Sequence, residues 1–203
     1  MTEDLHAFLR SRRSIRRFEP DPVPEEVVRR ILQTATHAPS AHNDQPWRFA
    51  VLLPEPVKRR LAEAMASDFR RDLAKDGLPE AEIVVRIERS RQRIIEAPVV
   101  ILLCMDEAGM DHYPDPERQL AERTMAVQST ALAGLQLLLA AHAESLGGVW
   151  TCGPLFAQQT VRGALALPET WQPQAMFFLG RPKGQTQEKT FRPPEETIRF
   201  INV

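Results

Sequence analysis

Apolar residues recur at helical spacing near the N-terminus of the chain. Leu5, Phe8 and Leu9 follow this spacing and the pattern stops at residues 12–18, so we expect a first helix that ends beside an arginine cluster. The stretch 21–39 has prolines before its apolar face begins, two glutamates in its first turn and a proline at its end. These features predict an amphipathic helix that stops at Pro39.

Further strands and helices follow along the chain. Residues 98–105 form a continuous apolar run rich in β-branched residues, which is typical of a strand buried on both faces. Gly147 and Gly148 are expected to end the longest helix. Strands interspersed with helices predict an α/β or α+β protein that is mostly helical. The predicted strands are 47–53, 98–105, 149–152 and 174–180, and the further helices are 55–77, 78–97, 116–145 and 157–167.

Length and charge narrow the class of protein. The 203 residues are enough for one well-buried domain, predicted to span 1–203. The 26 basic and 27 acidic side chains give a net charge of -1, which favours neither nucleic acid nor a membrane as a partner. The uncharged run 124–143 contains Gln, Ser, Thr and His, so it predicts a buried helix. The charged N-terminus lacks the apolar core of a signal peptide, and the expected location is the cytoplasm.

The cysteines and histidines suggest no metal or redox chemistry of their own. Cys104 and Cys152 are far apart in sequence and have apolar neighbours, so neither a disulfide framework nor a paired-cysteine metal site is expected. No histidine partner is identifiable for Cys152, which favours a small buried packing residue over a nucleophile. The five histidines show no metal-ligand spacing, so no metal is predicted. The Rossmann glycine fingerprint is also absent.

Two basic clusters are candidates for an anion site. The first surrounds a serine after the first predicted helix, and the second lies in the proline-restrained tail. Either cluster could be a solvated basic surface, but guanidinium groups also bind phosphate in a forked geometry and a serine hydroxyl adds a hydrogen bond. If the two clusters meet in space, they suggest one phosphate. They comprise Arg12, Arg13, Ser14, Arg16 and Arg17, and Lys189 and Arg192.

Four motifs in a fixed order resemble one family across almost the whole chain. "RRSIRRF", "APSAHNDQPWRF", "GGVWTCGPLF" and "KTFRPPEETI" together resemble the nitroreductase-like FMN flavoproteins. Within that superfamily, the stretches "AERTMAVQSTALA" and "LLLAAHAESLG" are most similar to the reductase domain of FbiB-type proteins of deazaflavin-coenzyme biosynthesis. In those proteins the domain is joined to a gamma-glutamyl ligase. That ligase half has no counterpart here, so ligase activity is not expected.

The resemblance implies an α+β fold with a central mixed β-sheet flanked by helices. It also implies an intertwined homodimer that holds two FMN molecules at the subunit interface. Phe191 departs from the family pattern, because many relatives have another basic residue there. The implied phosphate and ribityl contacts are Arg12, Arg13, Ser14 and Arg16, joined by Lys189 and Arg192 from the tail.

Three further segments match flavin contacts of the family. One reaches the flavin from the second subunit, one lines the pyrimidine side of the ring, and one lies beside flavin N5. Because a proline in the last segment has no amide hydrogen, the N5 donor would be Gly153 or Leu155. In order, the matching residues are Pro39, Ser40 and Ala41; Ser90 and Arg93; and Cys152, Gly153, Pro154 and Leu155.

The remainder of the loop at 40–47 is interpreted as scaffold. Asn43 and Gln45 are placed to bond the backbone of a tight turn ahead of Pro46, with the role of Asn43 left open. Trp47 is expected to anchor the following strand by burial. Gln45 and Trp47 are therefore not expected to take part in chemistry.

These features predict an FMN-dependent oxidoreductase that passes hydride from NAD(P)H, through flavin N5, to a conjugated acceptor of nitroaromatic or quinone type. No residue is assigned as an obligatory acid or base. Arg70, Arg71 and Lys75 are either available to an anionic substrate or part of a solvated face, and the solvated face is favoured. The alternatives are reduction of a deazaflavin-type biosynthetic intermediate, a flavin-binding module without turnover, and a structural dimer with a vestigial site.

Overall fold

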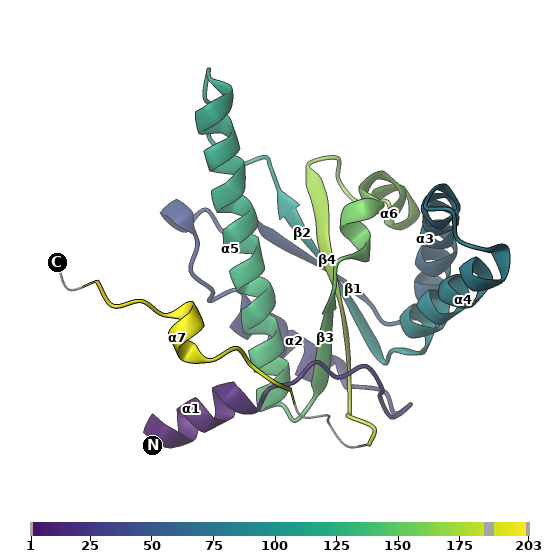
Figure 1. Cartoon of the computed structure of the whole chain (residues 1–203), viewed down its shortest axis with the longest axis horizontal. Coiled ribbons are helices and arrows are strands. Elements are labelled where there is room, and N and C mark those ends of the chain that lie inside the picture. The colour runs from purple at the N-terminus through teal and green to yellow at the C-terminus, as the bar shows by residue number, and fades with distance from the viewer. Residues whose placement is uncertain (1, 185–188, 202–203) are drawn as a thin grey trace.

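The structure is a computed structural model that describes residues 2–184 and 189–201. Its helices and strands confirm the α+β class (Figure 1). The helices are α1 (Thr2–Ser11), α2 (Glu25–Ala35), α3 (Glu55–Lys75), α4 (Glu80–Glu96), α5 (Pro116–Ala143), α6 (Gln158–Leu165) and α7 (Pro194–Thr197), with two 3-10 turns, η1 (Ala41–Asn43) and η2 (Gly153–Phe156). The strands are β1 (Trp47–Leu52), β2 (Val99–Asp106), β3 (Gly147–Thr151) and β4 (Trp171–Gly180).

The four strands form one sheet in the order β1-β2-β4-β3, and every neighbouring pair is antiparallel. The expectation of a mixed sheet therefore needs a correction. β2 and β3 run in the same direction, but β4 lies between them, so these two strands do not pair. Among the described residues, parallel pairing is confined to an isolated bridge between Ser14 and Gly148.

The sheet lies between two layers of helices, and its central strand β2 contributes side chains to the core on both faces. The β2 side chains alternate between the faces: Val99, Ile101 and Leu103 join the core under α2 and α5. Val100 and Leu102 join the core under α3 and α6. All of β2 is buried, as its continuous apolar run predicts. The sheet is therefore covered on both sides, which leaves its edges and the segments beyond it to form sites.

The strand β4 begins at Trp171, earlier than the predicted Gln174. Its register with β2 shifts between Leu103 and Cys104, and Cys104 faces Pro173 across the irregularity. A proline cannot donate a hydrogen bond to a neighbouring strand, so it is tolerated at such a break in the ladder. The polar and proline residues before the apolar run hid this part of the strand from the sequence pattern.

The longest helix ends earlier than predicted. α5 stops at Ala143, Ser145 takes a left-handed φ of 59°, and Gly147 and Gly148 already belong to β3. A Cβ atom on Gly147 would lie 2.7 Å from the Cβ of Ile15, which is closer than real side-chain contacts. The glycine is therefore needed for the close approach of the N-terminal segment to β3, and it does not end the helix.

The helix α5 is long and apolar enough to cross a membrane by length and composition alone. Half of its most apolar 18-residue stretch is buried inside the protein, where the helix packs on α2 and the sheet. This burial is the pattern of a core helix, as the sequence predicts.

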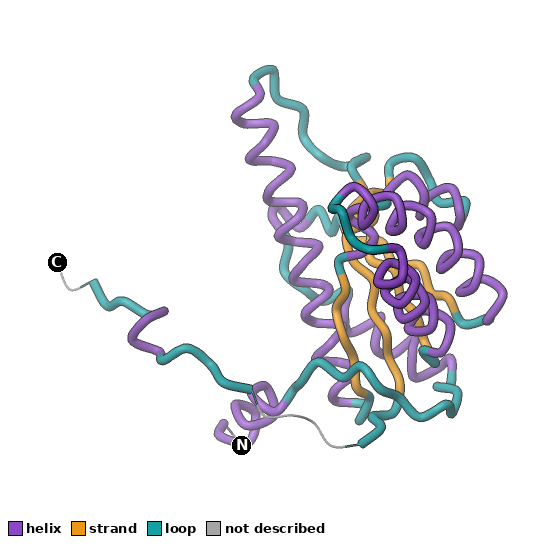
Figure 2. Tube along the Cα trace, turned by 45° about the vertical axis from the view of Figure 1, so that its right-hand side comes forward, coloured by secondary structure: helices purple, strands orange, loops and turns teal. Residues whose placement is uncertain are grey.

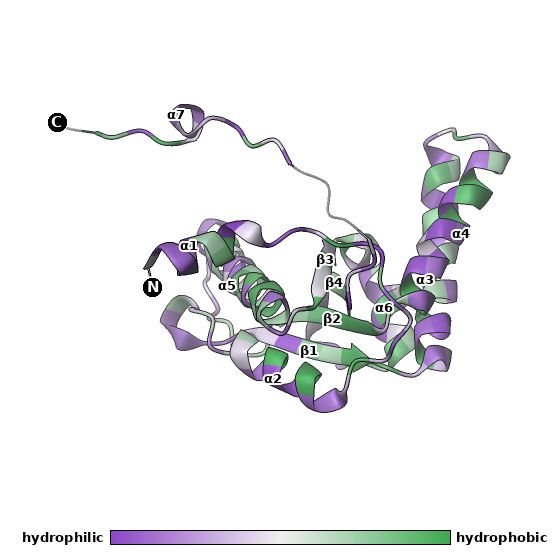
Figure 3. Cartoon of the chain, turned by 90° about the horizontal axis from the view of Figure 1, so that it is seen from below, coloured by the Kyte–Doolittle hydropathy of each residue, from purple (hydrophilic) through white to green (hydrophobic). Residues whose placement is uncertain are grey.

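Two parts of the chain extend beyond the sheet. The helices α3 and α4 form a projecting hairpin (Figure 3), whose distal part has a small core of Leu73, Ile83 and Ile87. The C-terminal tail with α7 extends away from the sheet (Figure 2) and exposes Phe200 and Ile201. The hairpin borders the candidate site described next.

Candidate functional site

The residues 12–18 form an extended segment that lies beside the edge strand β3. Ser14 bridges to Gly148, and the amide of Ile15 donates to the Gly148 carbonyl at 3.0 Å. Phe18 makes a second bridge, to Pro182 after β4. These backbone contacts fix the segment, and they divide its arginines between two pockets.

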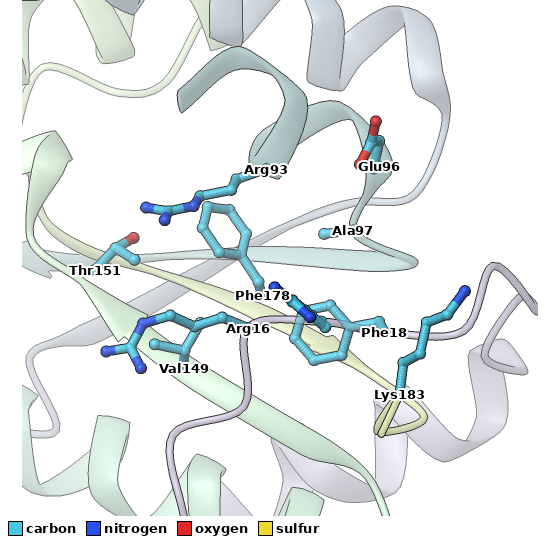
Figure 4. A pocket seen from close by; sticks show the side chains of 10 residues that line it. Arg16, Phe18, Arg93, Glu96, Ala97, Val149, Thr151, Phe178 and Lys183 are labelled. Carbon is cyan, nitrogen blue, oxygen red and sulfur yellow. The ribbon is translucent and has the colours of Figure 1, made fainter. Parts of the chain in front are cut away.

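The first pocket, called the basic pocket, has a volume of about 270 Å³. Arg16 from the N-terminal segment and Arg93 from α4 lie on either side of an apolar floor formed by Val149 and Phe178 (Figure 4). Thr151 contributes a hydroxyl. The full lining is Arg16, Arg17, Phe18, Arg93, Glu96, Ala97, Val149, Thr151, Phe178 and Lys183.

The guanidinium groups of Arg16 and Arg93 differ from most arginines of the chain. Within residues 2–184 and 189–201, neither has an ion pair or a hydrogen bond. Lys183 lies 3.7 Å from a carboxylate oxygen of Glu19. In contrast, ten arginines pair with carboxylates, namely Arg29, Arg30, Arg48, Arg59, Arg70, Arg71, Arg86, Arg91, Arg118 and Arg123. The basic pocket therefore presents three cations that have no counter-ion in the described part of the chain, because Arg17, which also lines the pocket, has no ion pair either.

The second pocket, called the arginine-histidine pocket, has a volume of about 310 Å³ and is lined by Arg12, Arg13 and His142, among others. The His142 ring stacks on Phe8 at 4.8 Å and one ring nitrogen lies 2.7 Å from the hydroxyl oxygen of Ser11. Burial, followed by the nearby charges of Arg12 and Arg13, lowers the pKa of His142. The imidazole is thus biased toward its neutral form.

The tail reaches this second pocket. The guanidinium carbon of Arg13 lies 5.9 Å from the centre of the Phe191 ring, a cation–π arrangement. Lys189 and Arg192 flank Phe191 in sequence, and both are exposed. The tail thus contacts the first cluster through Phe191, the position where the sequence departs from the family pattern, whereas the meeting of Lys189 and Arg192 with that cluster stays a prediction.

The turn η2 follows β3 and corrects one expectation. Cys152 is exposed, not buried as its apolar neighbours suggested, because the chain leaves the sheet directly after Thr151. Its sulfur accepts a hydrogen bond from the indole nitrogen of Trp150 at 3.1 Å. Pro154 is the buried residue of this turn. The amide of Leu155 donates to the Cys152 carbonyl at 3.0 Å, which leaves Gly153 as the candidate donor to a ligand.

A third pocket, called the acidic groove, lies between α3, α4 and η2 and has a volume of about 400 Å³. Ser90 and Gly153 both line it, so the structure brings together one residue expected at the pyrimidine side of a flavin and one expected beside flavin N5. Neither Arg70 nor Arg71 is free for an anionic substrate, since Arg70 pairs with Glu80 and Arg71 with Asp68. The full lining is Met65, Asp68, Phe69, Asp72, Leu73, Asp76, Ser90, Gly153, Phe156 and Ala157.

The loop at 40–47 is held by its own hydrogen bonds. The hydroxyl of Ser40 accepts from the amide of Gln45 at 3.1 Å, and the Gln45 side chain donates to the Asn43 carbonyl at 3.4 Å. Asn43 takes a left-handed φ of 63°, and Trp47 is buried. The predicted burial of Trp47 and the predicted bond of the Gln45 side chain to the turn backbone are confirmed.

Pro39, Ser40 and Ala41 do not line the basic pocket, the arginine-histidine pocket or the acidic groove. Ala41 instead lies beside α5, where its amide donates to the Ser129 hydroxyl at 3.1 Å. Within a single chain, this segment therefore lies apart from the other candidate residues. The resemblance to the family assigns it to the flavin of a second subunit.

Sequence reasoning missed part of the basic pocket. Val149, Thr151, Phe178 and Lys183 come from strands and from the turn after β4, and no local motif marks them. Alternation along β3 is the signal that was present, since Val149 and Thr151 share one face. Among the described residues, no group of three or more His, Cys, Asp or Glu could hold a metal ion.

An antiparallel sheet between helical layers, with basic pockets along one edge, defines an α+β protein suited to a phosphate-bearing ligand. The family model described as "Nitroreductase family" matches residues 9–181. The chain therefore belongs to the nitroreductase family. The predicted superfamily and oxidoreductase class are confirmed, whereas the closer likeness to the FbiB-type reductase domain stays a prediction.

Individual relatives agree with this assignment. A 5,6-dimethylbenzimidazole synthase of Rhodospirillum rubrum is 32% identical over 188 residues, covering 89% of this chain and 83% of the relative. An NADH dehydrogenase of Thermus thermophilus is 33% identical over 196 residues, covering 84% and 83%. A Desulfovibrio desulfuricans structure, described as a nitroreductase in complex with FMN, superposes with a TM-score of 0.72 at 28% identity and covers 98% of this chain and 97% of its own.

Proposed function

We propose that the protein is an FMN-dependent oxidoreductase that transfers hydride from NAD(P)H to a conjugated small-molecule acceptor of nitroaromatic or quinone type. The observation that carries the proposal is the pair of guanidinium groups of Arg16 and Arg93, which lack counter-ions among the described residues and flank the apolar floor of the basic pocket. A family relative of known structure binds FMN.

The chemistry of the donor set fits FMN. The ligand combines a flat ring with a polar pyrimidine edge and an anionic phosphate. The floor of Val149 and Phe178 suits the ring, and Arg93 with Ser90 suits the pyrimidine edge. Arginine and serine side chains near the N-terminus suit the phosphate and ribityl chain. The proposed set is Arg12, Arg13, Ser14, Arg16, Lys189 and Arg192 at that end, Cys152 to Leu155 beside the ring, and Pro39, Ser40 and Ala41 from a second subunit.

When bound, FMN would supply the hydride chemistry between the nicotinamide and the acceptor. The protein's own groups tune and shield that chemistry. The cation of Arg93, which is exposed in the single chain, would stabilise negative charge on the pyrimidine side. The Gly153 amide, which has no backbone partner within the described chain, is the hydrogen-bond donor toward the centre of the ring. Val149 and Phe178 exclude water from one face. No side chain is required as an acid or base.

The proposed active form is a homodimer. The helix α1 has no buried residue along Thr2–Ser11, and it exposes Leu5 and Leu9. The helix α5 exposes Leu132 and Leu135 on the side away from the sheet. Apolar area of this extent on extended segments is typical of a surface covered by a partner. Sedimentation equilibrium tests the proposal, which predicts twice the chain mass; a monomer at micromolar concentration contradicts it.

The test of the reaction uses purified protein saturated with FMN and mixed anaerobically with NADH or NADPH. The proposal predicts bleaching of the flavin absorbance, and its return when a quinone or nitroaromatic is added. Bound flavin that neither nucleotide reduces would instead favour a flavin-binding module. A deazaflavin-type intermediate belongs in the same acceptor screen. The cytoplasmic location stays a prediction that this assay does not address.

A second candidate rests on the Rhodospirillum rubrum relative, which is 32% identical over most of this chain. Its name states a synthase of 5,6-dimethylbenzimidazole. If this chain shares that activity, 5,6-dimethylbenzimidazole would be detected among the products of the FMN-loaded protein. Chromatography of such a reaction separates the two candidates.

A further inference from the structure

The acidic groove adjoins the basic pocket on two elements. Ser90 and Arg93 lie about one turn apart on α4, and the first lines the groove while the second lines the basic pocket. Thr151 and Gly153 are similarly divided along β3 and η2. A ligand in the basic pocket and a ligand in the acidic groove would therefore be neighbours.

The groove has walls suited to a flat apolar group. Met65 and Phe69 contribute from α3, and Leu73 forms a buried part of the wall. Phe156 stands opposite, on η2, with 79% of its surface exposed. An exposed aromatic side chain at the mouth of an apolar groove is unusual unless a ligand or a partner covers it.

The polar part of the lining is negative. Asp68, Asp72 and Asp76 follow one another at four-residue spacing, which places them on the same face of α3. Asp76 is the C-cap residue of this helix, so the negative end of the helix dipole adds to its charge. Among the described residues, no lysine or arginine lines the groove.

The nearest cations on α3 offset only part of this charge, because a single guanidinium serves both Asp68 and Asp72, and Asp76 has no ion pair among the described residues. Arg71 is shared between Asp68 and Asp72, and Arg70 is bound to Glu80 on α4. The Asp68 carboxylate also accepts a hydrogen bond from the Thr160 hydroxyl. This bond is the largest cause of the lowered pKa of Asp68, ahead of the contact with Arg71, and it favours the ionised carboxylate. Lys75 is exposed on the neighbouring position of the helix but is not part of the lining.

We propose that the acidic groove receives the acceptor and selects conjugated molecules that carry a positive charge, such as a protonated amine or a quaternary ammonium. The apolar walls hold the conjugated part, and the carboxylates of Asp72 and Asp76 attract the cation. This substrate class rests on the proposed function, in which the adjoining basic pocket holds the flavin. It reverses the alternative in which Arg70, Arg71 and Lys75 serve an anionic substrate.

The test compares three nitroaromatics of one shape: 4-nitrobenzyl-trimethylammonium, 4-nitrobenzyl alcohol and 4-nitrobenzoate. The FMN-loaded protein is first reduced with light and a sacrificial donor, so NAD(P)H is not needed, and oxidation of the flavin by each compound is followed in a stopped-flow instrument. We expect second-order rate constants in the order cation, alcohol, anion. The ratio of cation to alcohol should fall as salt is added, since the carboxylates are partly exposed.

Two variants assign the preference to the groove. Asp72→Asn combined with Asp76→Asn should lower the ratio of cation to alcohol by about five- to twentyfold, on the order of the worth of two partly exposed ion pairs. Asp76→Asn alone, at the exposed C-cap, should lower the ratio of cation to alcohol by about two- to fivefold. This single variant keeps the test valid if the double variant does not fold. The matched control is Asp21→Asn, which removes the same charge from an exposed position outside the groove and should leave the ratio unchanged.

The outcomes separate the two proposals. Protein that binds no FMN overturns the proposed function. Protein that binds FMN and reduces all three compounds at equal rates overturns the groove's selectivity alone. The selectivity also fails if the cation is preferred but the double variant keeps the full preference, because the charge would then act from elsewhere.

Discussion

The arginines of the N-terminal segment and those of the α3–α4 hairpin are put to different uses. On the hairpin, Arg59 and Arg86 each pair with a glutamate one turn earlier on the same helix. In the extended segment, Arg16 has no carboxylate partner within the described chain. Arg93, the hairpin arginine that lines the basic pocket, has none either. An arginine in the sequence is therefore informative about function only after its counter-ions are known.

Local geometry explains the difference. In a helix, residues three and four apart are neighbours, so a glutamate at that spacing captures the guanidinium group. An extended segment offers no such neighbour. Arg93 lies on a helix, where Arg89 and Ser90 in the preceding turn supply no carboxylate; Glu96, three residues later on α4, lines the same pocket but does not pair with Arg93. The same residue type is thus neutralised on one element and left to bind an anion on the other.

The largest effect is expected at Arg93. Replacing Arg93 by Gln removes the cation beside the proposed pyrimidine edge, with a loss on the order of 1.5–3 kcal/mol in stabilisation of developing charge. Reduction of bound flavin by NADH or NADPH should slow by about ten- to hundredfold, measured from the flavin absorbance in a stopped-flow instrument. Arg93→Lys should recover part of the rate because it restores the charge. If the Gln variant reduced its flavin as fast as the wild type, Arg93 would not contribute to the reaction.

A smaller effect, on the pH dependence of stability, is expected from His142 in the arginine-histidine pocket. Burial, then Arg12 and Arg13, lower the pKa of His142 below its usual 6.5. The unfolded chain therefore binds a proton more readily than the folded protein between the lowered pKa and 6.5, and the free energy of unfolding decreases as pH falls through that window. Thermal midpoints from about pH 7.5 to about pH 5 measure this loss.

His142→Asn should flatten that part of the pH profile, since no imidazole remains to titrate. The stability difference between wild type and variant would then change with pH. A constant difference across the window would show that folding does not lower the pKa of His142.

The smallest effect is expected from an already paired arginine. Arg86→Gln breaks an exposed ion pair with Glu82, which is worth at most about 0.5 kcal/mol in a helix. Chemical denaturation should show this small loss, and FMN affinity should not change. A clear loss of FMN affinity in this variant would remove the distinction between paired and unpaired arginines.

Much of the fold follows from the sequence. The apolar run of β2 and the amphipathic face of α2 determine their elements because burial is periodic and local. The end of α5 could not be predicted in the same way, because Gly147 and Gly148 resemble a helix stop. Their role depends on Ile15, which is far away in sequence. The position of β4 between β2 and β3 is likewise a non-local fact.

The site was predictable as residues, but not as pockets. The motif around Ser14 indicated an anion site, yet its bridge to Gly148 separates Arg12 from Arg16. The exposure of Cys152 depends on where the chain leaves the sheet, which neighbouring residue types do not reveal. The ion pair of Arg70 depends on Glu80 of α4, whereas the partners of Arg71, Asp68 and Asp72, lie on its own helix and were visible in the sequence.

The central claim is that unpaired arginines of the basic pocket hold FMN. The most direct measurement is a calorimetric titration of FMN into the apoprotein, its Arg16→Gln/Arg93→Gln variant and a matched Arg59→Gln/Arg86→Gln control. The account predicts saturable binding, with one FMN per chain, for the wild type and the control, and at least about hundredfold weaker binding for the first variant. Equal affinity in all three proteins, or no binding by the wild type, would contradict it.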